Sequence, residues 1–124
     1  MTKRRGRHSN QRVGREGEAI AADYLREHGF TVARQNWRCQ YGEVDIIARD
    51  RAGTLIFVEV KTRRSRGAGD PLEAITPLKL SHMNAVAQEW RLQHRFSGRI
   101  RLDAIGVTLG VPGAPRIEHL RGVS

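Results

Sequence analysis

The sequence predicts an α/β fold, in which helices flank a mixed β-sheet and the elements follow the order α-β-β-β-α-β-β. Apolar residues recur at helical spacing in two segments, residues 13–28 and 77–94. Runs rich in Val, Ile and Phe, separated by Gly, Pro and Asp, predict strands between and after these helices. The 124 residues are enough for one domain and too few for two. We therefore expect one domain over residues 13–121, preceded by a basic flexible arm over residues 1–12.

The first helix is expected over residues 13–28, with Gly29 placed to end it. Glu18 lies along the edge of its apolar stripe, where an acid can reach inward. The preceding arm is rich in Lys and Arg, and residues 1–15 contain no acid. Such a segment either follows a phosphate backbone or serves as a solubilising tail, and the sequence leaves both roles open.

Residues 42–61 predict a β-hairpin, because two apolar runs flank a short polar segment. If Asp50 and Thr54 close a three-residue loop, Gly53 falls where such a hairpin requires a positive φ, which glycine adopts readily. The strand before this hairpin is expected over residues 30–38, so that the first three strands form a meander.

The predicted register places four charged side chains on one face of the hairpin. Asp45 faces Glu59 and Glu43 faces Lys61, because side chains alternate along a strand. Opposed like charges destabilise a strand pair, so the two carboxylates need a neutralising group. Oxygen ligands of this kind suit Mg²⁺ or Mn²⁺. The alternative, a solvated outer face, fits less well because the same face carries several apolar residues.

Asp45, followed by Glu59-Val60-Lys61 on the next strand, resembles the D…ExK constellation of the restriction-endonuclease-like nuclease superfamily. More closely, the chain resembles the YraN family, small bacterial proteins similar to Holliday-junction resolvases. The matching segments lie within about residues 13–110 and read VGREGE (13–18), NWRC (36–39), GEVD (42–45) and FVEVKTR (57–63). Val44 stands where the wider superfamily has proline, which places the chain with the resolvase-like branch and removes no ligand.

The resemblance implies a restriction-endonuclease-like fold and a metal-dependent endonuclease site. In such a site Asp45 and Glu59 hold the metal, and the carbonyl of Val60 adds a ligand. Lys61 is then the catalytic lysine, and Glu18 approaches the metal through water. Glu43 is a supporting acid beside this set.

A basic segment, residues 62–69, follows the proposed site directly. It contains glycine and no large apolar residue, which is typical of a loop, and its arginines suit phosphate recognition. Elsewhere we would interpret such a segment as a solvated loop, but its position favours contact with a substrate. The residues expected to contact nucleic acid are Arg63, Arg64, Lys79, Arg15 and Arg38.

The second half of the chain begins with helix-start signals at Asp70 and Thr76, each followed by proline. We expect a short turn, then the main helix over residues 77–94, with an apolar stripe packed on the sheet. Two further strands are expected over residues 99–107 and 116–120. Trp37 is interpreted as a packing residue, and Cys39 as a small half-buried residue at a strand end.

The net charge of +9 and pI of about 11.1 favour a polyanionic partner, either nucleic acid or an acidic membrane surface. No apolar run is long enough for a membrane span or a signal peptide, so we expect a cytoplasmic protein without membrane insertion. A single cysteine excludes an internal disulfide, and the histidines lack the spacing of a zinc site.

Two functions remain open at this stage, besides a weaker one as a membrane-surface adaptor. The leading hypothesis is a Mg²⁺-dependent nuclease that hydrolyses phosphodiester bonds of DNA, with branched or single-stranded DNA as candidate substrates. The alternative is a nucleic-acid-binding module that keeps the fold and the acids without turnover. Because resolvases act as dimers, the resemblance adds a homodimer to the candidate partners.

Overall fold

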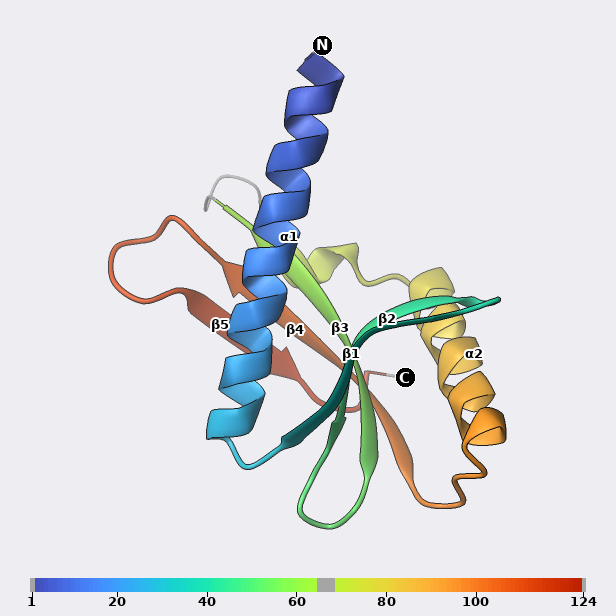
Figure 1. The fold of residues 1–124 in the computed structure, drawn as a ribbon. Coiled ribbons are helices and arrows are strands. Elements are labelled where there is room, and N and C mark those ends of the chain that lie inside the picture. Colours follow the sequence, from blue (N-terminus) through green and yellow to red (C-terminus); the bar gives the residue numbers. More distant parts are fainter. Residues whose placement is uncertain (1, 65–68, 124) are drawn as a thin grey trace.

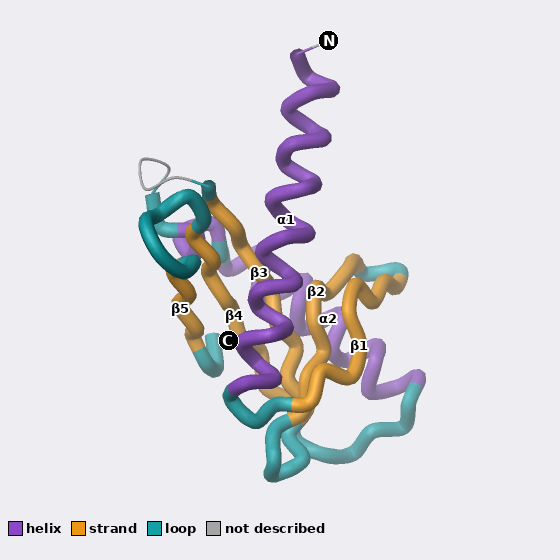
Figure 2. The backbone as a smooth tube through the Cα atoms, turned by 60° about the vertical axis from the view of Figure 1, so that its left-hand side comes forward, coloured by secondary structure: helices purple, strands orange, loops and turns teal. Residues whose placement is uncertain are grey.

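Five strands form one mixed sheet, with α1 on one face and α2 on the other (Figures 1 and 2). The computed structural model describes residues 2–64 and 69–123, with side chains from residue 12 onward. The strands are β1–β2–β3–β4–β5 in spatial order; β3 and β4 are parallel, and the other neighbours are antiparallel. The elements are α1 (Thr2–Glu27), β1 (Thr31–Cys39), β2 (Gly42–Arg49), β3 (Leu55–Arg63), the short 3₁₀ helix η2 (Pro71–Ala74), α2 (Pro77–Gln93), β4 (Ile100–Thr108) and β5 (Arg116–Leu120).

This architecture confirms the predicted α/β class and the element order. The helix starts occur where expected: Asp70 caps η2 by accepting from Leu72 N, and Thr76 caps α2 by accepting from Lys79 N. Helix α1 begins at Thr2, well before the expected start, and its first turns extend beyond the sheet (Figure 1). The flexibility of residues 1–12 stays a prediction. Of the predicted basic loop, residues 65–68 lie outside the described residues.

The hairpin between β2 and β3 has the predicted turn. Asp50 N donates to Thr54 O over 3.1 Å, and Gly53 has a φ of 89°. Asp50 Oδ1 also accepts from the backbone nitrogens of Ala52 and Thr54, each over 2.9 Å, which fixes the loop from inside. The turn therefore sets the register, which pairs Ile46 with Val58 and continues to Arg49 with Leu55.

The predicted continuation of this ladder is wrong. The β2–β3 pairing ends at Ile46 and Val58, so Asp45 is not paired with Glu59, nor Glu43 with Lys61. Beyond this point β2 stays paired with β1, and the distal part of the β1–β2 hairpin turns away from β3 towards α2 (Figure 1).

The expectation that all four charged side chains share one face is also wrong. Val44 packs in the same core cluster as Ile47, although strict alternation would place them on opposite faces. The β1–β2 hairpin rotates about its own axis between the levels of Val44 and Ile47, so the prediction failed where the strands stop being regular.

Two apolar clusters hold the layers together. The α1-side cluster joins α1 to the sheet and includes Ala21, Leu25, Ile46, Val58 and Ile105. The α2-side cluster includes Trp37, Phe57, Met83, Val86 and Leu102, with Trp90 and Cys39 packed against it. The expected packing of Trp37, the half-buried place of Cys39 and the packing of the apolar stripe of α2 on the sheet are thus confirmed. Within the described ranges, neither helix combines the length and apolarity that crossing a membrane requires.

Candidate functional site

The separation of β2 from β3 creates a fork, and Asp45, Glu59 and Val60 meet there. Asp45 Oδ2 accepts from Val60 N over 2.7 Å, in place of a backbone ladder bond. The N–H and C=O groups of one strand residue point towards the same neighbour, so the Val60 carbonyl also faces the fork. The fork therefore gathers two carboxylates and one carbonyl from neighbouring strands.

Glu59 is the most deeply placed acid of the fork, with an exposed fraction of 4%. Its Oε1 lies 3.3 Å from Lys61 Nζ and 3.3 Å from Lys79 Nζ. Lys61 follows on the same face of β3, whereas Lys79 comes from the first turn of α2, where the Thr76 cap orients the chain. Lys79, expected as a nucleic-acid contact near the site, thus lies against Glu59 at its centre.

Glu18 enters from the α1 side of the sheet. The helix can approach β3 closely because Gly17 has no side chain: a Cβ built on Gly17 would overlap Thr62 Oγ1. Glu18 is half-buried beside the fork as a result. Gly17 was not recognised as a site residue from the sequence, since a glycine inside a helix shows no sign of what it will pack against.

Asn36 joins Glu18 to Glu43. With its amide oriented so that the nitrogen faces these acceptors, Asn36 Nδ2 lies 2.7 Å from Glu18 Oε1 and 3.2 Å from Glu43 Oε1. Glu43 also forms an ion pair with Arg38, whose Nη2 lies 2.7 Å from Glu43 Oε2. Asn36 was assigned no role from the sequence, although it lies in one of the segments that carry the family resemblance.

The carboxylates of the fork repel one another. Burial and the charge of Glu59 raise the pKa of Asp45 to about 7, although the bond from Val60 N opposes this shift. The charges of Glu18 and Glu43 add to the shift. Burial, followed by the charge of Glu43, likewise raises the pKa of Glu18. The electrostatic conflict expected between Asp45 and its neighbours is therefore present, even though Asp45 and Glu59 are not ladder partners.

This donor set fits a hard divalent cation by its chemistry. Asp45, Glu59 and the carbonyl of Val60 supply oxygens, and a divalent charge would offset the repulsion that raises the pKa of Asp45. Among the described residues, no three His, Cys, Asp or Glu side chains already form a metal-binding group. A metal at the fork would therefore depend on the backbone carbonyl and on water as well as the two carboxylates.

The predicted arginines lie on several elements around the fork. Arg63 ends β3, and both it and Arg15 of α1 are exposed. Arg64 is exposed and lies near Glu16 of α1, with Nη2 3.7 Å from Oε2. Arg38 is exposed on β1 and is held by Glu43. The structure brings Lys61 and Lys79 to Glu59, while these arginines stay on the surrounding surface.

Comparison with known proteins identifies the family. The profile of the "Uncharacterised protein family UPF0102" matches residues 17–107. The chain belongs to the UPF0102 family. A UPF0102 protein of Beutenbergia cavernae is 46% identical over 112 residues, which cover 90% of this chain and 94% of the relative. Relatives from Streptomyces griseus (46% over 114 residues; 90% and 95% covered) and Mycobacterium avium (46% over 113 residues; 90% and 88% covered) carry the same name. The match to UPF0102 spans every residue that forms the fork.

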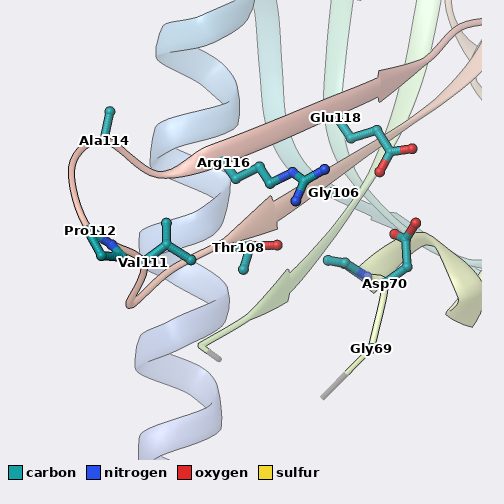
Figure 3. A pocket seen from close by; sticks show the side chains of 10 residues that line it. Gly69, Asp70, Gly106, Thr108, Val111, Pro112, Ala114, Arg116 and Glu118 are labelled. Carbon is teal, nitrogen blue, oxygen red and sulfur yellow. The ribbon is translucent and has the colours of Figure 1, made fainter. Parts of the chain in front are cut away.

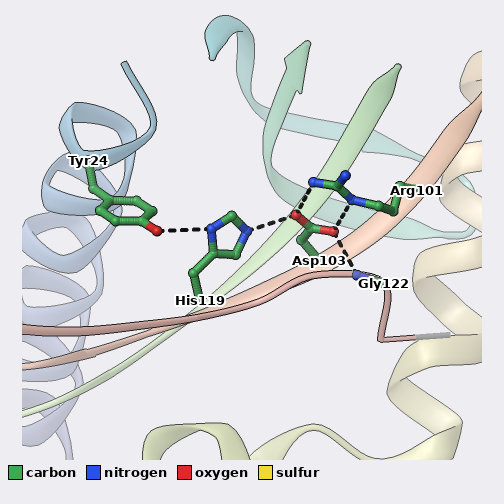
Figure 4. A network of polar contacts seen from close by, with 5 residues as sticks. All are labelled: Tyr24, Arg101, Asp103, His119 and Gly122. Carbon is green, nitrogen blue, oxygen red and sulfur yellow. Dashed lines mark hydrogen bonds and ion pairs between the residues drawn. The ribbon is translucent and has the colours of Figure 1, made fainter. Parts of the chain in front are cut away.

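A second polar cluster of this UPF0102 chain runs from α1 to β4 and the C-terminal segment, and it was not predicted (Figure 4). Asp103 of β4 is fully buried and accepts from Arg101, from His119 Nε2 over 2.8 Å and from Gly122 N over 3.0 Å. His119 Nδ1 in turn lies 3.1 Å from the hydroxyl of Tyr24. The cluster therefore ties β5 and the C-terminal segment to β4 and α1, which indicates a structural role.

A cavity lies between η2 and the β4–β5 pair (Figure 3). Its volume is about 530 Å³, and its polar lining comes from Asp70, Thr108, Arg116 and Glu118. These residues differ from the predicted site residues, and they combine opposite charges, whereas the fork gathers mainly acids. The fork is therefore the better candidate for the functional site of this UPF0102 protein.

Proposed function

We propose that this protein is a Mg²⁺- or Mn²⁺-dependent nuclease of restriction-endonuclease-like fold that hydrolyses phosphodiester bonds of DNA. The observation that carries the proposal is the convergence of Asp45 and Glu59 from separating strands, with Lys61 against Glu59. Mutual repulsion at such a fork lowers stability, and such a cost is common where the site has a use for the charges. Cation binding followed by phosphate chemistry is such a use.

Each residue of the fork has a role in this proposal. Asp45, Glu59 and the carbonyl of Val60 would hold the metal, and Glu18 would bind a water beside it. When bound, the metal supplies a more acidic water and neutralises charge on the phosphate. Lys61, whose Nζ lies 3.3 Å from Glu59 Oε1, places an ammonium where it can stabilise the negative charge that develops on the phosphate during hydrolysis. Lys79 offers a second ammonium from the opposite element at the same distance.

The surrounding basic residues suit a DNA backbone. Arg63 ends β3 and Arg64 follows it, and Arg15 and Arg38 are exposed on α1 and β1. Planar guanidinium groups can hold phosphate through two parallel hydrogen bonds. A net charge of +9 adds an attraction that salt weakens. Branched and single-stranded DNA remain the proposed substrates.

The proposal is tested by cleavage of labelled single-stranded, duplex, flap and four-way-junction DNA, with Mg²⁺ or Mn²⁺ against EDTA. Wild type should yield products only with metal, and Glu59→Ala should yield none. Glu27→Ala, which removes an exposed acid at the C-terminal end of α1, is the matched control and should cleave like wild type. Metal-independent products, or equal products from Glu59→Ala, would contradict the proposal.

One observation favours a second candidate, a nucleic-acid-binding module without turnover. Lys61 and Lys79 already neutralise Glu59 within the chain, so this acid has partners without a metal. A binding module should bind DNA in a salt-dependent way, with equal affinity for wild type and Glu59→Ala, and should cleave no substrate of the panel.

A further inference from the structure

Asn36 occupies an unusual backbone conformation at the fork. It lies within β1, yet its φ is 54°, in the left-handed region that few residues other than glycine adopt. Asparagine tolerates this region better than most residues, but a strand interior rarely contains it. Such local strain persists only where the surrounding structure holds it, and it is common at functional sites.

The position of Asn36 relates it to Asp45. Gln35 pairs with Ile46 and Trp37 pairs with Val44, so Asn36 and Asp45 lie opposite each other between these two pairs. Asp45 is also the first residue of β2 beyond the end of its ladder with β3. The left-handed residue and the break in the sheet therefore occur at the same level.

The two strands rotate at this level. Ile46 belongs to the α1-side cluster, whereas Trp37 and Val44 belong to the α2-side cluster. In regular strands Ile46 and Val44 would share a face. The hairpin thus turns over between these residues, and its distal part packs against α2: a Cβ built on Gly42 would lie 3.8 Å from a Val86 methyl group.

The side chain of Asn36 acts in the same place. Its amide nitrogen lies between carboxylates that come from different elements, Glu18 of α1 and Glu43 of β2. An amide can donate two hydrogen bonds from one nitrogen, so one side chain can hold two repelling acids near each other. An aspartate here would add a third negative charge, and a glycine would leave the two acids without this link.

We propose that Asn36 is a positioning residue of the metal site, whose left-handed backbone turns the hairpin away from β3 and whose amide holds Glu18 beside Asp45. This inference rests on the proposed nuclease function. Both properties of Asn36, its left-handed backbone and its amide, would thereby help to form the metal site. Because the residue acts through Glu18 and Glu43, it is expected to affect metal affinity more than folding.

The test compares Asn36→Gly and Asn36→Asp with wild type. Glycine keeps the left-handed backbone and removes only the amide, whereas aspartate keeps the shape and replaces the donor with a charge. Gln35→Gly, at the neighbouring exposed residue of β1, controls for a glycine in this strand. The measurements are Mn²⁺ affinity of the protein alone by calorimetry, the melting temperature without metal, and metal-dependent cleavage.

We expect Asn36→Gly to weaken Mn²⁺ binding by roughly 10-fold to 100-fold, the usual effect of losing a residue that orients metal ligands. The loss of Mn²⁺ affinity in Asn36→Gly should be large relative to any fall in its melting temperature. Asn36→Asp should lose more Mn²⁺ affinity than Asn36→Gly. Gln35→Gly should bind Mn²⁺ like wild type. Cleavage should fall in parallel with Mn²⁺ affinity.

The outcomes separate this inference from the function on which it rests. If wild type binds Mn²⁺ and cleaves DNA while Asn36→Gly does both equally well, the inference is overturned and the nuclease stands. If Asn36→Gly loses Mn²⁺ affinity only together with a large fall in melting temperature, and Gln35→Gly shows the same losses, the role of Asn36 is structural and the inference also fails. If wild type neither binds Mn²⁺ nor cleaves, the proposed function fails and the inference falls with it.

Discussion

Asp103, which is fully buried, and Asp45, which is half-buried, show opposite uses of the same side chain. Burial alone would raise the pKa of Asp103, but bonds from His119, Arg101 and Gly122 N outweigh it and hold that pKa at about 2. Asp45 receives one backbone bond and faces other acids, so its pKa is raised instead. Asp103 therefore stabilises the fold in its ionised form, whereas ionised Asp45 destabilises it.

Asp45→Asn is expected to stabilise the protein at pH 8 and to remove metal binding. The pKa of Asp45 is about 7 in the folded state, above its ordinary value of 3.8, so its ionisation costs stability progressively as the pH rises from about 4 to 7. Asparagine removes that cost and can still accept from Val60 N. The gain in free energy of unfolding should be on the order of 2 kcal/mol at pH 8.

Urea unfolding of both proteins at several pH values measures this difference. The gain should shrink as the pH falls below 7 and approach zero below about pH 3, where Asp45 is protonated in both the folded and the unfolded wild type. A gain that is constant across this range, or a loss at pH 8, would contradict the assignment of Asp45 as an uncompensated acid.

Asp103→Asn should have the opposite effect. Its folded pKa of about 2 lies below the ordinary 3.8, so its contribution to stability is complete above about pH 4 and is lost as the pH falls towards 2. The variant leaves the half-buried guanidinium of Arg101 without its buried counter-charge and should lose on the order of 3 kcal/mol at pH 7. Thermal unfolding from pH 7 to pH 2 should show the two proteins converging in acid.

At the scale of elements, the contact between α1 and β3 depends on Gly17. Gly17→Ala would place a methyl group on Thr62, so we expect α1 to shift and the protein to lose roughly 1–3 kcal/mol of stability. Gly14→Ala is the matched control, because a Cβ at Gly14 has no described neighbour within 4 Å. That variant should gain about 0.5–1 kcal/mol from helix propensity alone.

Denaturant unfolding of the two variants distinguishes packing from propensity. If both substitutions stabilise the protein, the close approach of α1 to β3 is not tight enough to matter. Because Gly17 precedes Glu18, the Gly17→Ala variant should also weaken Mn²⁺ binding, which Gly14→Ala should leave unchanged.

Much of the element structure follows from local rules that the sequence displays. Capping residues marked the starts of η2 and α2, and the Asp50 loop with Gly53 fixed the hairpin register from Arg49 to Ile46. These rules assume that each strand stays regular along its length, so they could not show that the pairing of β2 with β3 stops at Ile46. The stop depends on Asn36, a residue on the neighbouring strand, and on packing of the hairpin against α2.

The site was predicted to a similar extent. The hairpin turn and the family resemblance both predicted that Asp45, Glu59 and Lys61 lie near one another; the structure has them at the fork, though not in the predicted pairing, and their roles stay a prediction. Lys79 was expected near the site, but its ion pair with Glu59 depends on how α2 crosses the sheet. The Asp103 cluster was missed because its members, from Tyr24 to Gly122, are far apart in sequence and individually ordinary.

At the scale of the whole molecule, an acidic fork lies within a strongly basic chain. The net charge of +9 attracts a polyanion, whereas the carboxylates of the fork repel one. A bound cation would reconcile the two, because it would neutralise the fork at the point where a phosphate would approach. The two helices hold this arrangement from opposite faces, α1 through Glu18 and α2 through Lys79.

Metal binding should therefore stabilise the whole fold. A ligand that binds only the folded state adds roughly 2.7 kcal/mol when its concentration is about 100 times its dissociation constant. We expect Mg²⁺ or Mn²⁺ to raise the melting temperature of wild type in a concentration-dependent way, EDTA to reverse the rise, and Glu27→Ala to respond like wild type. Glu59→Ala should show no rise, since it lacks one of the two carboxylates. An equal rise in the melting temperature of Glu59→Ala would mean that the cation binds elsewhere on the protein and that the fork is not the metal site.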